Sequence, residues 1–151
     1  MNILGSQYTL THKALEIYIS GCSGNPHCIG CHNPESWDFN QGYLYDEEYF
    51  EKIKFKVKDF NILIENIMIF GGEPNDQNHD ELLHFLTDMK SLNKKLWLFT
   101  RYDITEVPEF ELILCDYIKT GAYIPELITE DNVQYGIKLA TSNQHIHKNC
   151  L

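Results

Sequence analysis

The sequence predicts an α/β fold in which helices cross over between the strands of a mostly parallel sheet. Three observations support it. Of the 151 residues 43% are apolar, no run of apolar residues exceeds four, and strand-like and helix-like segments alternate along the chain. A chain of this size buries roughly 68–70% of its unfolded surface as one domain, so we expect a single domain over residues 1–151. A complete eight-fold β/α barrel needs about 250 residues and is excluded.

The first strand is expected at residues 15–20. Leu15, Ile17 and Ile19 alternate there with Glu16, Tyr18 and Ser20, which is typical of a half-buried strand. This strand leads directly into a loop, residues 21–37, in which three of the five cysteines fall.

The central part of the chain then predicts helix, strand, helix, strand. Asp46 can cap a helix with an apolar stripe, and residues 66–70 form a buried strand that ends in Gly-Gly. A second helix starts near Asn78, and residues 95–99 form the third strand. Right-handed crossovers between such strands give a parallel sheet, whose ligands bind at the carboxyl ends of the strands.

The last third of the sequence has weaker signals. We expect a short helix at residues 109–114, an extended piece at 116–119 and a late strand near 135–139. No repeat or linker divides the chain.

The cysteine loop is the strongest indication of chemistry. Cys22, Cys28 and Cys31 have the spacing Cys-x5-Cys-x2-Cys, and three thiolates select zinc, copper(I) or an iron–sulfur cluster. A [4Fe-4S] cluster held by three cysteines keeps one iron free to bind a substrate. The alternative is a structural Cys3His zinc site that uses His27 or His32.

A second motif follows the strand at residues 66–70. Glycines at such a point let a ligand approach the backbone, and Pro74 fixes the exit of the turn. An ordinary strand-to-helix turn is the alternative. The motif is Gly71-Gly72-Glu73-Pro74.

Together these motifs resemble the radical S-adenosylmethionine (SAM) enzymes. Residues 21–22 and 28–37 resemble their cluster loop, and residues 71–74 match their SAM-binding turn. Within that superfamily the chain resembles the small activases of anaerobic ribonucleoside-triphosphate reductase, through the stretches 98–102, 116–121, 126–127 and 142–144. One departure is the spacing, because the family usually has three residues between its first two cysteines and this chain has five, residues 23–27.

The resemblance implies a partial, open β/α barrel of radical SAM type, two cofactors and a set of residues that hold them. The metal ligands of the [4Fe-4S] cluster are Cys22, Cys28 and Cys31, and the second cofactor is SAM. Its ammonium group is received by Gly71, Gly72 and Glu73, and His32 lies beside its adenine. The full set of SAM-contacting candidates is Gly30, Cys31, His32, Gly71, Gly72, Glu73 and Thr100.

The implied reaction is reductive cleavage of SAM to methionine and a 5'-deoxyadenosyl radical, which removes a hydrogen from a glycine of the partner reductase. The implied partners are the large subunit of anaerobic ribonucleoside-triphosphate reductase and a low-potential electron donor such as flavodoxin. Two other enzyme functions stay open, an activase for a different glycyl-radical enzyme and a 7-carboxy-7-deazaguanine synthase. The non-enzyme alternative is a zinc-stabilised interaction module.

The composition argues against two classes of protein, those that bind nucleic acid and those that span a membrane. A formal net charge of −10 argues against a nucleic-acid surface, and no apolar run approaches the 18–20 residues of a membrane span. The N-terminal residues do not resemble a secretion signal, so we expect a soluble cytoplasmic protein. Cys115 is expected in the core, Cys150 at the surface, and His79 and His84 as surface or capping residues rather than ligands.

Overall fold

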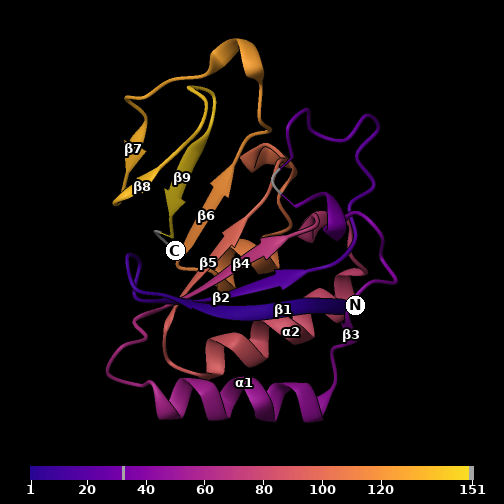
Figure 1. Cartoon of the computed structure of the whole chain (residues 1–151), viewed down its shortest axis with the longest axis vertical. Coiled ribbons are helices and arrows are strands. Elements are labelled where there is room, and N and C mark those ends of the chain that lie inside the picture. Colours follow the sequence, from indigo (N-terminus) through magenta and orange to yellow (C-terminus); the bar gives the residue numbers. More distant parts are fainter. Residues whose placement is uncertain (32, 150–151) are drawn as a thin grey trace.

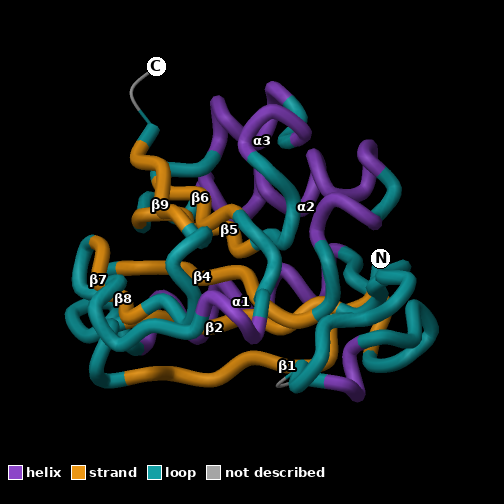
Figure 2. The backbone as a smooth tube through the Cα atoms, turned by 90° about the horizontal axis from the view of Figure 1, so that it is seen from above, coloured by secondary structure: helices purple, strands orange, loops and turns teal. Residues whose placement is uncertain are grey.

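The computed structural model describes residues 1–31 and 33–149, and its main feature is one seven-stranded mixed sheet (Figure 1). The strand order is β3-β1-β2-β4-β5-β6-β9, and Figure 2 shows β1, β2, β4, β5, β6 and β9 in this order from above. The strands are β1 (Asn2–Thr9), β2 (Ala14–Ile19), β3 (Tyr43–Leu44), β4 (Asn66–Gly71), β5 (Lys95–Phe99), β6 (Tyr117–Thr120), β7 (Val133–Gln134), β8 (Ile137–Lys138) and β9 (His145–Lys148). The α-helices are α1 (Glu47–Asp59), α2 (His79–Ser91) and α3 (Glu109–Leu114), and short 3-10 turns cover Pro34–Ser36, Pro74–Asp76, Ile104–Glu106 and Pro125–Leu127.

The four central strands confirm the expected parallel unit. β2 pairs with β4, β4 with β5 and β5 with β6, all in parallel. The helices between them begin where the sequence predicted. The Asp46 carboxylate accepts the N–H of Tyr49 at 2.8 Å, and the Asn78 side chain accepts the N–H groups of Asp80 and Glu81.

The edges of the sheet correct the expectation of a mostly parallel sheet. β1 pairs antiparallel with both β2 and β3, and β9 pairs antiparallel with β6. β1 and β9 were not predicted, because each contains few buried apolar side chains and depends on its neighbour for a partner.

Alternation along β4 separates the two faces of the sheet. Ile67 and Ile69 pack into the larger core, to which α1 and α2 contribute. Met68 packs on the other face with Trp97 and Leu139. In Figure 1 α1 and α2 accordingly lie below the sheet, and the β7–β8 hairpin lies on the other side. The carboxyl ends of β2, β4, β5 and β6 lead into loops and 3-10 turns.

The late strand expected near residues 135–139 is a short hairpin instead. β7 and β8 pair antiparallel across a turn at Tyr135 and Gly136, both with positive φ, 49° and 80°. In the described part of the chain, no helix is both long and apolar enough to cross a membrane.

Candidate functional site

The two motifs meet at the carboxyl ends of neighbouring strands, as the sequence predicted. β2 and β4 run in parallel with Ile19 opposite Gly71. The N–H of Gly72 donates to the carbonyl of Ile19 at 2.8 Å, and the N–H of Glu73 donates to the carbonyl of Gly21 at 2.7 Å. The ladder thus continues past the strands and joins the cysteine loop to the Gly-Gly turn.

The structure supplies its own reason for the two glycines of the turn. A Cβ on Gly72 would lie 2.1 Å from the carbonyl oxygen of Gly21, and one on Gly71 would lie 2.3 Å from that of Ile19. Gly71 also has a φ of +105°. Close approach between two chain segments therefore demands glycine here, and contact with SAM stays a prediction.

Gln77 also links the start of the cysteine loop to the Gly-Gly turn. Its side-chain amide nitrogen lies 3.0 Å from the carbonyl oxygen of Ser20 and 3.1 Å from those of Gly21 and Glu73. The side chain is buried, and its amide adds a donor to carbonyl groups of both segments, of which those of Gly21 and Glu73 also accept a backbone N–H. Gln77 was not predicted from the sequence, in which only its position directly after the proline turn distinguishes it.

The three cysteines of the loop face one cavity. Cys22, Cys28 and Cys31 are free and half-buried, and all three line a cavity of about 270 Å³ at this edge of the sheet. Gly71, Gly72, Glu73, Thr100 and Gly30 line it too, so the structure brings the described candidate residues together. His32 lies outside the described residues.

Three free thiols at one cavity are the kind of donor that a [4Fe-4S] cluster takes. Within residues 1–31 and 33–149, no three His, Cys, Asp or Glu side chains converge as ligands of a single metal ion. A cluster does not require such convergence, because each cysteine binds a different iron. Burial raises the pKa of the Cys22 thiol, so a metal bound there would have to displace its proton.

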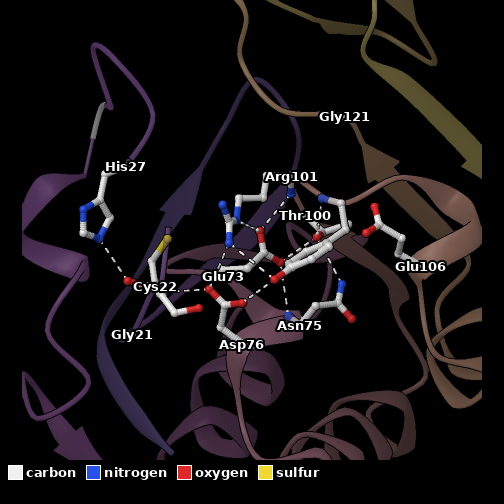
Figure 3. Close-up of polar contacts among 12 residues, drawn as sticks. Gly21, Cys22, His27, Glu73, Asn75, Asp76, Thr100, Arg101, Glu106 and Gly121 are labelled. Carbon is white, nitrogen blue, oxygen red and sulfur yellow. Dashed lines mark hydrogen bonds and ion pairs between the residues drawn. The ribbon is translucent and has the colours of Figure 1, made fainter. Parts of the chain in front are cut away.

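Two aromatic side chains support the cysteine loop. The indole N–H of Trp37 lies 3.4 Å from the sulfur of Cys31. His27 stacks on Trp37 with ring centroids 4.0 Å apart, and its Nε2 lies 3.0 Å from the carbonyl oxygen of Cys22. His27 thus contacts the backbone of the loop, and Figure 3 shows its ring turned to that carbonyl.

Asp76 connects the proline turn to the five-residue stretch between Cys22 and Cys28. Its carboxylate accepts the backbone N–H of Ser23 and the hydroxyl of Tyr102, each at 2.7 Å, and lies 3.5 Å from the Arg101 guanidinium (Figure 3). The Tyr102 and Ser23 hydrogen bonds hold the pKa of Asp76 below its ordinary value, although burial opposes them. Asp76 is therefore ionised at neutral pH. Its hydrogen bond to Ser23 holds the start of residues 23–27, the stretch in which this chain departs from the usual spacing of the cysteines.

Glu73 points to the end of β5. The Thr100 hydroxyl donates to Oε1 at 2.5 Å, and the Arg101 backbone N–H donates to Oε2 at 2.8 Å. The side chain is 2% exposed, and burial raises its pKa. These donors make the Glu73 side chain a link between the turns after β4 and β5.

A second buried carboxyl lies behind this turn. Glu111 on α3 is 0% exposed, and neither of its side-chain oxygens has a hydrogen-bond partner. Burial raises its pKa to about 8, with a further contribution from Glu73. Glu111 therefore holds a proton at neutral pH.

The remaining candidates lie away from the cavity. Cys115 is 0% exposed, and burial raises its pKa, which confirms a core thiol. His84 and His79 are exposed side chains of α2, as expected. Cys150 lies outside the described residues.

Comparison with known proteins places the chain in a family. Residues 13–147 match the family described as a 4Fe-4S single cluster domain. The matched residues include the cysteine loop and the Gly-Gly turn. The chain belongs to this family. The family match supports one [4Fe-4S] cluster, and the residues that hold it stay a prediction.

Individual relatives cover nearly the same residues. The chain is 30% identical over 138 residues to the anaerobic ribonucleoside-triphosphate reductase-activating protein of Haemophilus influenzae, over 87% of this chain and 85% of the relative. Proteins of the same name from Vibrio cholerae and Escherichia coli K12 are 26% and 25% identical over 136 and 137 residues, with the same coverage.

Proposed function

We propose that this protein is a radical SAM activase that generates a glycyl radical on anaerobic ribonucleoside-triphosphate reductase. Support comes from its family, from relatives named as activators of that reductase, and from the resemblance of its two motifs. The observation that carries the proposal is the meeting of three free thiols and the Gly71-Gly72-Glu73 part of the turn in one cavity.

The chain's own residues would hold and orient two cofactors. Cys22, Cys28 and Cys31 would ligate three irons of a [4Fe-4S] cluster, and the fourth would bind SAM. The turn at residues 71–74 would receive the ammonium group of SAM, and Gly30, His32 and Thr100 would contribute the rest of its site. Half-burial of the thiols would limit the access of water and oxygen.

The cofactors would supply the chemistry. With both bound, one electron from an outside donor, passed through the cluster, would cleave the C5'–S bond of SAM to give methionine, and a hydrogen atom from a glycine Cα of the reductase would pass to the 5' carbon to give 5'-deoxyadenosine and a glycyl radical. The electron donor would be a low-potential protein such as flavodoxin, and the reaction would take place in the cytoplasm.

The proposal includes a single domain over residues 1–151 and the partial, open β/α barrel of the superfamily. Four parallel central strands with helices on one face support it. The antiparallel strands β1 and β9 flank that unit.

The test is an anaerobic incubation of the iron-loaded protein with the reductase from the same organism, SAM and dithionite. We expect a glycyl-radical doublet in the electron paramagnetic resonance (EPR) spectrum of the reductase, with 5'-deoxyadenosine formed at a matching yield. Cys28→Ala should abolish both. If 5'-deoxyadenosine forms and the reductase gains no radical, the activase assignment is wrong and another radical SAM function takes its place.

A further inference from the structure

Two buried polar groups behind the Gly-Gly turn lack a hydrogen-bond donor. Within residues 1–31 and 33–149, neither carboxyl oxygen of Glu111 has a partner, and the buried Oδ1 of Asn75 has none either. The Asn75 side chain opposes the rise in the pKa of Glu111 as a hydrogen-bonding neighbour, so the two side chains lie close together. A carboxylate and an amide oxygen can only accept hydrogen bonds, so an ionised Glu111 would leave both groups unsatisfied.

The amide of Asn75 leads to the carboxylate of Glu73. Its Nδ2 donates to the Thr100 hydroxyl at 3.1 Å, and Figure 3 shows this nitrogen turned to Thr100. Thr100 in turn donates to Oε1 of Glu73 at 2.5 Å, and the backbone N–H of Asn75 donates to the same oxygen at 3.1 Å. The orientation of the Asn75 amide therefore decides how the Thr100 hydroxyl is held on Glu73.

Of the two buried carboxyls, Glu111 is the one that keeps a proton. Glu73 accepts from the Thr100 hydroxyl and from the backbone N–H groups of Asn75 and Arg101, all of which favour its ionised form. Glu111 accepts from none of the described residues, and burial raises its pKa to about 8, with a further contribution from Glu73. The two environments thus separate the protonation states of the pair.

No other group near Glu111 offsets its burial. Cys115, at the end of α3, is a buried thiol whose pKa burial raises, so it is neutral and donates no positive charge. Lys90 of α2 is engaged in an ion pair with Asp116. Glu111 therefore stays a carboxylic acid, which carries the one donor that the Asn75 Oδ1 lacks.

The geometry points to Glu111 as a positioning residue of the SAM site, which donates its carboxyl proton to Oδ1 of Asn75 and so holds the Asn75 amide nitrogen on Thr100. This inference rests on the proposed function, in which Glu73 receives the ammonium group of SAM. The described residues that line the cavity include Thr100 and Glu73 but neither Asn75 nor Glu111. Glu111 would thus act on SAM through Asn75 and Thr100, without touching it.

A reversed Asn75 amide shows what this proton prevents. Without a donor at residue 111, the Asn75 amide nitrogen would turn away from Thr100 and its oxygen would take that place. The Thr100 hydroxyl would then have a second acceptor and would no longer be committed to Glu73. The carboxylate that receives the ammonium group would lose its fixed orientation.

The test measures SAM binding to iron-loaded protein by anaerobic equilibrium dialysis. We expect Glu111→Leu, which removes the donor, to weaken SAM binding about 3- to 10-fold, the usual size of one neutral hydrogen bond. Glu111→Gln keeps a donor for Oδ1 of Asn75 and should bind SAM within about 2-fold of wild type. Glu109→Leu, at an exposed position of the same helix, is the matched control and should change nothing.

A double variant tests whether the effect passes through Asn75. Asn75→Ala should weaken SAM binding on its own, and Glu111→Leu added to it should cause no further loss. Losses that add in the double variant would mean that Glu111 acts by another route and would overturn the inference.

Infrared spectra of the metal-free protein test the proton without any cofactor. The difference between wild type and Glu111→Gln at neutral pH should contain the C=O stretch of a protonated carboxyl, and Asn75→Ala should shift this band. A spectrum without the band, or a band that Asn75→Ala leaves unchanged, would overturn the inference.

The outcomes separate this inference from the proposed function. If wild-type protein binds SAM and Glu111→Leu binds it equally well, the role of Glu111 is wrong and the proposed function stands. If iron-loaded wild type does not bind SAM, the proposed function fails, and the role of Glu111 in SAM binding fails with it. Equal loss of SAM binding in Glu111→Leu and Glu111→Gln, with a lower Tm in both, would make Glu111 a structural residue and overturn the inference.

Discussion

The carboxylate of Asp76 accepts the backbone N–H of Ser23 at 2.7 Å, and this contact joins residues that are 53 positions apart. Ser23 directly follows the first cysteine of the loop, and Asp76 closes the 3-10 turn that begins at Pro74. One side chain therefore fixes the cysteine loop relative to the turn beside it.

Asp76→Ala should loosen the cysteine loop. Loss of a hydrogen bond to a charged group costs about 1.5–3 kcal/mol, so the iron-loaded variant should lose iron to a chelator about 10-fold faster or more. The measurement is the anaerobic decay of cluster absorbance. Tyr102→Phe is the graded control, because it removes one hydrogen bond to Asp76 and keeps the bond to Ser23. Equal rates of iron loss for Asp76→Ala and wild type would show that the hydrogen bond between Asp76 and Ser23 does not hold the loop.

Gly72→Ala tests the close packing of the two turns. Its Cβ would lie 2.1 Å from the carbonyl oxygen of Gly21, which is backbone and cannot swing away. We expect the free energy of unfolding to fall by about 1–3 kcal/mol or more, from denaturant curves of the metal-free protein. Gly5→Ala is the matched control, because a Cβ there meets nothing within 4 Å. A Gly72→Ala variant as stable as Gly5→Ala would contradict the packing account.

Glu111→Gln should change how stability depends on pH. Burial raises the pKa of Glu111 from 4.5 to about 8. The folded protein thus keeps a proton that the unfolded chain has lost, so the wild-type free energy of unfolding should fall as pH rises from about 4.5 to about 8. The glutamine variant cannot ionise and should lack this contribution. It should therefore be more stable than wild type near pH 8, by an amount of order a few kcal/mol.

Denaturant unfolding at several pH values measures this difference. Glu73, whose pKa burial also raises, contributes a fall of the same sign in both proteins, so their difference reports mainly on Glu111. Glu109→Gln, an exposed neighbour on α3, should follow wild type. Parallel curves for Glu111→Gln and wild type would mean that Glu111 is ionised in the folded protein.

The central fold was predictable because its elements carry strong local signals. β2, β4 and β5 have buried apolar side chains, and Asp46 and Asn78 cap α1 and α2 through their own side chains. β1 was missed because it has one buried apolar residue, although its partner β2 is the next strand in the chain, and β9 was missed because its partner β6 is distant in sequence. A single sequence carries little of that information.

The same distinction applies to the site. The cysteines and the Gly-Gly turn could be predicted together, because parallel topology brings the carboxyl ends of adjacent strands to one edge. Gln77 and Asp76 could not, since each acts through contacts with segments far away in the sequence. Their residue types alone are equally typical of a solvated surface.

The most direct test of the account is anaerobic reconstitution of the protein with iron and sulfide, followed by EPR of the reduced protein with and without SAM. The account predicts about four irons per chain, a cluster signal that changes when SAM is added, and loss of both in Cys28→Ala. A colourless protein that holds one zinc and does not respond to SAM would contradict it and would assign the three cysteines to a structural site.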